Sequence, residues 1–198
     1  MNVAIRSIWF DAGGVLLQGI GHRLAEFYAQ KHHVPRELIL ESWNKTHTDP
    51  AVPLGGFWKS YFKGFGAQED IDEATALYKT MLHPVEGMEE IVASLKGRYV
   101  LVLANNESHD TDLLRDSFLQ HFRWFDYRCS SWMLRVAKPD EEFYRRILDI
   151  VKIPPEECLF IDDREVNLVP ARALGIRTIL FKDAQQLKSE MRKLGVDI

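Results

Sequence analysis

The chain has 198 residues, of which 46% are apolar and 27% are charged, and its formal net charge is -4. These values are typical of a globular protein that buries a full core as one domain, or as one domain with a modest insertion. The net negative charge provides no basic patch for a nucleic-acid partner, and no apolar run approaches membrane-spanning length. We therefore expect neither nucleic acid nor a membrane as a partner. Because the first residues do not follow the pattern of a secretion signal, a cytoplasmic location is expected.

The first predicted strand ends on a carboxylate. In the stretch SIWFDAGGVLL, residues 7–17, an apolar run is followed by Asp11, Gly13 and Gly14. An apolar run closed by turn residues is typical of a buried parallel strand, and ligands of open α/β sheets bind at the carboxyl ends of such strands. This stretch alone fits either a ligand-binding Asp11 or an ordinary aspartate of a turn.

A block of four predicted helices follows this strand, at residues 22–33, 36–47, 55–65 and 69–82. The third helix contains the stretch GGFWKSYFKGF, in which Phe57, Tyr61 and Phe65 share one face and Trp58 and Phe62 lie beside it. Aromatic side chains at this spacing predict the core of the block. A ring exposed towards a substrate is the alternative.

From residue 87 onward, predicted helices and strands alternate. The helices are at 87–96, 110–121, 140–151, 165–174 and 184–194, and the strands at 99–104, 125–130, 158–162 and 176–181. Together with the first strand, this pattern predicts an α/β fold with a doubly wound parallel sheet of five strands. In the helix at 140–151, Asp140 is the expected N-cap, with Phe143, Ile147 and Ile150 on the inner face.

Polar residues follow two more of the predicted strands. Asn105 and Asn106 come at the end of the stretch YVLVLANN, and Asp162 and Asp163 end the stretch CLFIDD. Two carboxylates held close together repel each other unless a cation or a lysine neutralises them. Lys138, in the stretch RVAKPDEEFY, is a candidate for that role, although a lone lysine before a helix usually lies in solvent.

Taken in order, the motifs WFDAGGVL, LVLANN, AKPDEEFY and FIDD resemble those of the haloacid-dehalogenase-like superfamily of phosphohydrolases along nearly the whole chain. The FDxGGVL form is most similar to a subgroup with a small helical cap that includes sugar-phosphate phosphatases. This resemblance implies a core domain of residues 1–16 and 85–198, a helical cap of residues 17–84, and the strand order 5-4-1-2-3. Asp11 would then lie at the point where the strand order reverses, which is where such sheets bind ligands.

The resemblance also implies a Mg²⁺-dependent phosphomonoester hydrolase that acts on a small phosphorylated substrate. Asp11 would attack the phosphoryl group and form an aspartyl-phosphate, which water then cleaves. Mg²⁺ would be held by Asp11, Asp162 and the backbone carbonyl of Gly13, with Asp163 as a possible alternate ligand.

Four further residues receive roles from the same resemblance. Lys138 would neutralise the carboxylates, keep Asp11 ionised and take part in phosphate binding. Asn105 would donate to a phosphoryl oxygen, and Asn106 beside it is a second expected phosphate-binding residue. Asn167 would support the metal site by binding one of its ligands.

Two positions depart from the family pattern. Many members have a second aspartate two residues after the nucleophile, where it protonates the leaving group, but here that residue is Gly13. The usual serine or threonine before Asn105 is replaced by Ala104. A catalytically weak or silent relative that binds a phosphorylated ligand or a protein partner is therefore the alternative function. Dehalogenation is a third and weaker option, because that reaction does not need the aspartate pair to hold a metal.

Three residues near the expected pocket, His22, Glu107 and His109, could replace the missing acid or could simply be surface residues. Cys129 and Cys158 fall on strands that the strand order separates by three spacings, about 14 Å, which excludes a disulfide between them. They are expected to be buried thiols in a reducing compartment. The sequence specifies neither the substrate nor an oligomeric state.

Overall fold

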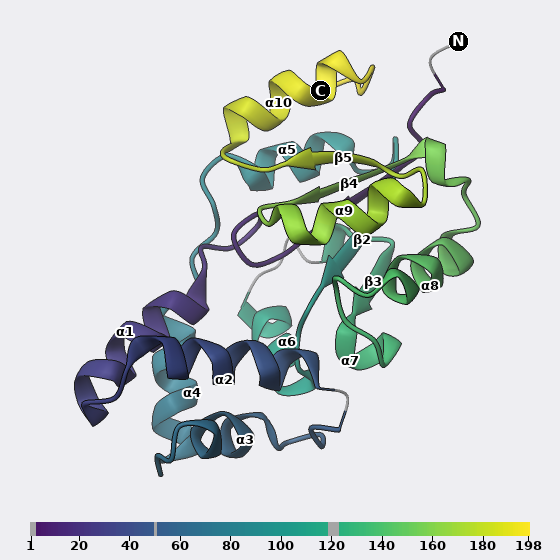
Figure 1. The fold of residues 1–198 in the computed structure, drawn as a ribbon. Helices are drawn as coiled ribbons and strands as arrows, with labels where there is room; N and C mark the ends of the chain where they lie inside the picture. Colours follow the sequence, from purple (N-terminus) through teal and green to yellow (C-terminus); the bar gives the residue numbers. More distant parts are fainter. Residues whose placement is uncertain (1–2, 50, 119–122) are drawn as a thin grey trace.

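A parallel sheet forms the centre of the molecule (Figure 1). A computed structural model describes residues 3–49, 51–118 and 123–198. In this part of the chain the strands are β1 (Ser7–Phe10), β2 (Val100–Asn105), β3 (Tyr127–Ser130), β4 (Cys158–Asp162) and β5 (Arg177–Leu180). They lie in the order β3-β2-β1-β4-β5, and every neighbouring pair is parallel. This is the predicted order read from the opposite edge, so the predicted sheet is confirmed.

Helices cover both faces of the sheet because successive strand residues point to opposite sides. Ile8 and Phe10 of β1 pack with α5 (Met88–Leu95) and α10 (Ala184–Lys193) on one face. Trp9 packs with α8 (Glu141–Val151) and α9 (Glu165–Ala173) on the other. Helix α6 (His109–Phe118) follows β2, and the short helix α7 (Ser131–Leu134) follows β3 directly. A 3-10 turn at Pro155–Glu157 leads into β4. Neither α7 nor this turn was predicted.

Four helices between β1 and α5 form the block that the sequence predicts: α1 (Ile20–His32), α2 (Arg36–Thr48), α3 (Phe57–Gly64) and α4 (Ile71–Thr80). They lie together at one end of the molecule, apart from α5 and α10 (Figure 1). The aromatic side chains of the stretch GGFWKSYFKGF are all buried, which confirms that they form a core rather than an exposed stripe.

The chain enters and leaves this block through two segments that lie side by side. The N–H of Gln18 donates to the carbonyl of His83 at 2.9 Å, and the N–H of Val85 donates to the carbonyl of Leu16 at 3.0 Å. The predicted boundaries of the cap, 16/17 and 84/85, fall at this crossing. The assignment of residues 17–84 to a separate cap stays a prediction.

Two sequence predictions about individual helices need comment. Ile150 does not face the core, because the buried face of α8 is formed by Phe143, Tyr144, Ile147 and Val151. Tyr144, whose hydroxyl donates to the carbonyl of Asn167, belongs to this buried face, whereas Ile150 lies at its margin and is 39% exposed. The end of the helix predicted at 110–121 lies outside the described residues.

The thiols of Cys129 and Cys158 are both buried and free, as expected. Among the described residues, no helix has the length and apolar character needed to cross a membrane.

Candidate active site

The carboxyl ends of three neighbouring strands bring the predicted site residues together. Phe10 of β1 pairs with residues on both β2 and β4, so the residues that follow these pairs lie in one row across the three strands. That row consists of Ala104, Asp11 and Asp162. Because the central strand contributes Asp11, this carboxylate lies between the other two strand ends.

Lys138 bridges the two carboxylates of this row. Its Nζ donates to Asp11 Oδ1 and to Asp162 Oδ2, each at 2.7 Å. The lysine side chain is 1% exposed, and Nζ lies 5.3 Å from the centre of the Phe160 ring. Lys138 is therefore buried, whereas a lone lysine before a helix usually lies in solvent. The segment between α7 and α8 directs it into the sheet edge, where one cation compensates two buried carboxylates.

The pKa of Asp11 shows that this compensation is partial. Burial raises the pKa, Lys138 lowers it, and the neighbouring Asp162 raises it again, so that the pKa of Asp11 increases from 3.8 to about 7. The role of Lys138 in keeping Asp11 ionised stays a prediction. A second cation at these carboxylates would favour the ionised form.

Asp11, Asp162 and Asp163 can hold such a cation. Each contributes a carboxylate oxygen, and these oxygens lie within 4.8 Å of one another. Oxygen ligands of this kind suit a hard divalent cation such as Mg²⁺. The side-chain amide of Asn167 holds Asp162 in place, because its Nδ2 donates to both carboxylate oxygens at 3.0 Å. This contact is the one that the resemblance implies for Asn167, and its role in supporting a metal stays a prediction.

The two glycines after β1 have different surroundings. Gly14 has a φ of +87°, and a Cβ at this position would lie 2.3 Å from Asp163 Oδ2, so glycine lets that carboxylate approach the turn. A Cβ on Gly13 would meet no atom within 4 Å. Gly13 lies in the turn two residues after Asp11, and its carbonyl as a metal ligand stays a prediction.

The predicted phosphate-binding asparagines differ in what their side chains contact. Asn105 is buried, its Oδ1 accepts from the hydroxyl of Ser130 at 2.9 Å, and its Nδ2 has no hydrogen-bond partner among the described residues. That free donor is compatible with the predicted bond to a phosphoryl oxygen. Asn106 instead directs its amide at the main chain of Lys138. The side chain of Ala104, in the row of Asp11, offers no donor.

Comparison with known proteins identifies the family. The model of the family described as haloacid dehalogenase-like hydrolase matches residues 5–175, which is most of the chain. The chain belongs to the haloacid dehalogenase-like hydrolases. This confirms the resemblance that the four ordered motifs indicate.

The hydrolase is similar to several characterised proteins over part of their length. It is 32% identical to bifunctional epoxide hydrolase 2 of Rattus norvegicus over 102 residues, which are 50% of this chain and 18% of that protein. It is 31% identical to the sesquiterpene phosphatase astK of Aspergillus oryzae over 117 residues, 57% of this chain and 58% of the fungal protein. The chain thus spans less than two thirds of either relative.

A solved structure shows the same fold. It is a haloacid dehalogenase family enzyme of Bacteroides thetaiotaomicron in complex with magnesium and inorganic phosphate. The TM-score is 0.68, the sequences are 20% identical, and the match covers 91% of this hydrolase and 96% of the bacterial chain.

The three residues weighed as replacements for the missing acid are engaged elsewhere in the hydrolase. His22 is exposed and its Nδ1 lies 2.7 Å from Arg36. His109 packs edge-on against the ring of Trp132. Burial raises the pKa of Glu107, but Arg115 and His47 more than offset this effect, so that its pKa lies below the usual value. Glu107 is therefore an ionised partner of Arg115 rather than a proton donor.

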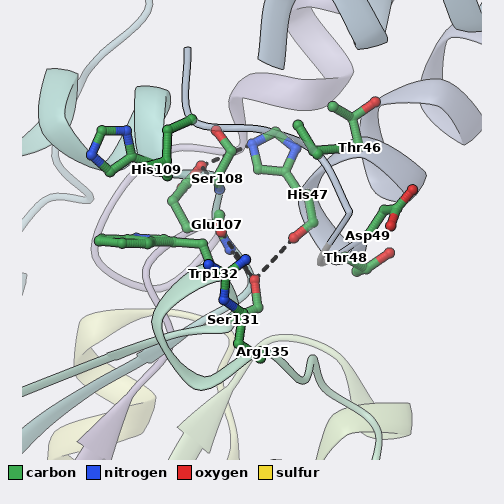
Figure 2. A pocket seen from close by; sticks show the side chains of 12 residues that line it. Thr46, His47, Thr48, Asp49, Glu107, Ser108, His109, Ser131, Trp132 and Arg135 are labelled. Atoms are coloured by element: carbon green, nitrogen blue, oxygen red, sulfur yellow. Dashed lines mark hydrogen bonds and ion pairs between the residues drawn. The ribbon is translucent and has the colours of Figure 1, made fainter. Parts of the chain in front are cut away.

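Glu107 belongs to a buried polar cluster that the sequence did not reveal. Figure 2 shows the side chains of His47, from the end of α2, and Glu107 and Ser131 turned towards one another. His47 Nε2 lies 2.8 Å from Glu107 Oε1, and the hydroxyl of Ser131 lies 2.9 Å from the carbonyl oxygen of His47. Arg115 of α6 pairs with Glu107 and donates to the hydroxyl of Tyr78 in α4 at 2.8 Å. This cluster ties the helical block to the segment that follows β2.

Proposed function

We propose that this protein is a Mg²⁺-dependent phosphomonoester hydrolase that acts on a small phosphorylated metabolite through an aspartyl-phosphate on Asp11. The observation that supports it most directly is the arrangement of Lys138 between Asp11 and Asp162, with Asp163 beside them. This arrangement gathers a nucleophile, a cation and a set of oxygen ligands at one point. The magnesium and phosphate in the bacterial enzyme of the same fold agree with this proposal.

In the proposed reaction, a carboxylate oxygen of Asp11 attacks phosphorus and the bond to the ester oxygen breaks. Lys138 holds the reacting carboxylate in place, and Asn105 donates to a phosphoryl oxygen. Water then cleaves the aspartyl-phosphate, releasing inorganic phosphate and restoring Asp11. Asp162, Asp163, Asp11 and the carbonyl of Gly13 would hold Mg²⁺, which supplies charge stabilisation for the transferred group.

Gly13 determines which substrates are plausible. Since it has no proton to give, the leaving group departs largely as an anion, and phosphates of acidic leaving groups, including anomeric sugar phosphates, should react fastest. The name of the fungal relative, a sesquiterpene phosphatase, agrees with phosphomonoester hydrolysis.

Gly13 and Ala104 favour a second candidate, a relative that binds a phosphorylated ligand or a protein partner without turnover. One experiment separates the two functions. Purified protein is assayed with p-nitrophenyl phosphate and a panel of sugar phosphates, with and without Mg²⁺, beside the Asp11→Asn variant. We expect Mg²⁺-dependent release of phosphate by the parent only. Equal release by both proteins, or none by either, would contradict the proposed reaction.

A further inference from the structure

Asn106, the residue after β2, holds the main chain of Lys138 at two points. Its Oδ1 accepts a hydrogen bond from the N–H of Lys138 at 2.8 Å, and its Nδ2 donates to the carbonyl of Lys138 at 2.8 Å. One side-chain amide thus engages both polar groups of a single main-chain residue. We infer that Asn106 is a positioning residue that places Lys138 between Asp11 and Asp162, an inference that rests on the proposed function.

Lys138 lies in a turn that is closed by a hydrogen bond from the N–H of Asp140 to the carbonyl of Ala137 at 3.0 Å, but the main-chain polar groups of Lys138 itself take no part in that bond. It lies in the segment between α7 and α8, and the next residue, Pro139, has no N–H group. Within the described part of the chain, its main-chain N–H and carbonyl form no hydrogen bonds other than those with Asn106. The two bonds therefore connect the start of this long, flexible side chain to the end of β2.

This connection matters because the ammonium group has two partners at the same short distance. Nζ lies 2.7 Å from Asp11 Oδ1 and 2.7 Å from Asp162 Oδ2. These oxygens belong to adjacent strands, so their positions are set by the sheet. A shift of the Lys138 main chain lengthens one bond or both, and a misplacement of about 1 Å in a catalytic group can cost roughly 10²-fold in rate.

The same contacts argue against Asn106 as a direct phosphate ligand. Phosphoryl oxygens need donors, but the Oδ1 of Asn106 faces an N–H and one of its two amide N–H groups is already used. The side chain is half-buried and its polar end is turned to the main chain of Lys138. Its effect on the reaction therefore passes through Lys138.

The placement can be tested without relying on turnover. Acetic anhydride labels amines, and mass spectrometry reports the labelling rate of each lysine. In Asn106→Ala, labelling of Lys138 should rise about tenfold or more relative to the other lysines, since two hydrogen bonds that oppose its opening are lost. Asn44→Ala, at an exposed position of α2, is the matched control and should leave Lys138 as it is in the parent. An unchanged Lys138 rate in folded Asn106→Ala overturns the inference.

The kinetic part of the test separates positioning from substrate contact. With p-nitrophenyl phosphate and Mg²⁺, Asn106→Ala should lower kcat by roughly 10- to 100-fold and leave KM within about threefold of the parent value. An unchanged kcat, or a higher KM at unchanged kcat, overturns the positioning role.

Two further outcomes stay distinguishable. If the parent hydrolyses no phosphate ester, the proposed function fails, and the labelling still shows whether Asn106 places Lys138. If Asn106→Ala does not fold, Asn106→Asp repeats the test with the same expected direction, because it is nearly isosteric, retains the acceptor for the Lys138 N–H and lacks the donor to the Lys138 carbonyl.

Discussion

Gly13 offers a direct test of how the leaving group departs in the proposed phosphatase reaction. A Cβ at this position would meet no atom within 4 Å, and Gly13 is not among the residues with positive φ. A Cβ can therefore be added at this position, two residues from Asp11, without a clash or backbone strain, and we expect an aspartate to be accepted there. It would supply the proton donor that many relatives have at this position.

The size of the expected effect depends on the leaving group. A general acid is worth about 10²- to 10⁴-fold in rate, or roughly 3 to 5 kcal/mol of transition-state stabilisation, when the departing oxygen is basic. For a phosphate of a primary alcohol, Gly13→Asp should raise kcat/KM by about 10²-fold, the lower end of that range. For p-nitrophenyl phosphate, whose leaving group is stable as an anion, the change should stay within about threefold.

An additional carboxylate also has an electrostatic cost. At a separation of about 5 Å and an effective dielectric constant of about 20, one like charge costs roughly 3 kcal/mol. Since three carboxylates already meet at this sheet edge, the variant should require Mg²⁺ more strongly than the parent, both for activity and for thermal stability. Gly13→Asn is the matched control, because it has the same shape and no proton of comparable acidity.

The assay is kcat/KM across phosphate esters of graded leaving-group pKa in the parent and both variants. We expect a steep dependence in the parent and in Gly13→Asn, and a shallow one in Gly13→Asp. A shallow dependence in the parent would refute the reasoning, because it would show that another residue supplies the proton. His22 and His109 would then be the first to mutate, ahead of the ion-paired Glu107.

Four further outcomes follow from the structure. Millimolar Mg²⁺ should raise the melting temperature of the parent, because a free Mg²⁺ concentration of 100 times Kd increases the free energy of unfolding by about 2.7 kcal/mol. Mg²⁺ should have no such effect on Asp162→Ala, and a parent whose melting temperature does not depend on Mg²⁺ would count against the metal site. Because burial raises the pKa of Asp11 from 3.8 to about 7, the folded state binds the proton of Asp11 more tightly than the unfolded state does. In EDTA, the stability of the parent relative to Asp11→Asn should therefore fall as pH rises from about 4 to 7, and an equal pH dependence of the two proteins in urea unfolding would contradict this. Asp11→Asn should in addition lack turnover. Glu107→Gln should lose about 3 to 5 kcal/mol at pH 7, and since the folded-state pKa of Glu107 lies below 4.5, this contribution should be present above about pH 4.5 and disappear as pH falls through that lower pKa. Tyr61→Phe removes a buried hydroxyl that has no hydrogen-bond partner among the described residues, so it should be neutral or stabilising, by up to about 1 to 3 kcal/mol. Tyr78→Phe removes a hydroxyl that accepts a hydrogen bond and should destabilise the protein. The reverse order of the two variants in urea unfolding would contradict the argument.

The strands and the polar residues at their ends could be predicted from the sequence because both depend on local signals, whereas the strand order and the roles of the site residues came from the family resemblance. Buried parallel strands are short apolar runs, so their last residues are easy to locate, and Asp11, Asn105 and Asp162 each follow such a run. Parallel strands present their carboxyl ends at one edge, which brings these residues together once the order of the strands is known. The position of Lys138 was harder to predict, because it lies outside the strands and a lysine before a helix usually lies in solvent.

Contacts between distant segments could not be predicted in this way. Glu107 and His47 are 60 positions apart, in the loop after β2 and in α2, and nothing in either local sequence indicates that their side chains meet at 2.8 Å. Asn106 was expected to bind phosphate because it directly follows Asn105 at a strand end. Its two hydrogen bonds to Lys138 depend on a segment that begins some 30 residues later in the chain.

Asn106 and Glu107 are consecutive, and this has a consequence for how the site is assembled. Asn106 binds the main chain of Lys138, while Glu107 pairs with His47 of the helical block and with Arg115 of α6. The N–H of Glu107 is held as well, by the hydroxyl of Ser131 at 3.0 Å. Neighbouring residues of a short connection cannot move independently. The end of β2 therefore sets both the position of the helical block and the position of Lys138. The two residues therefore connect the fold of the block to the geometry at Asp11 without either of them contacting that carboxylate through a hydrogen bond or ion pair in the described part of the chain.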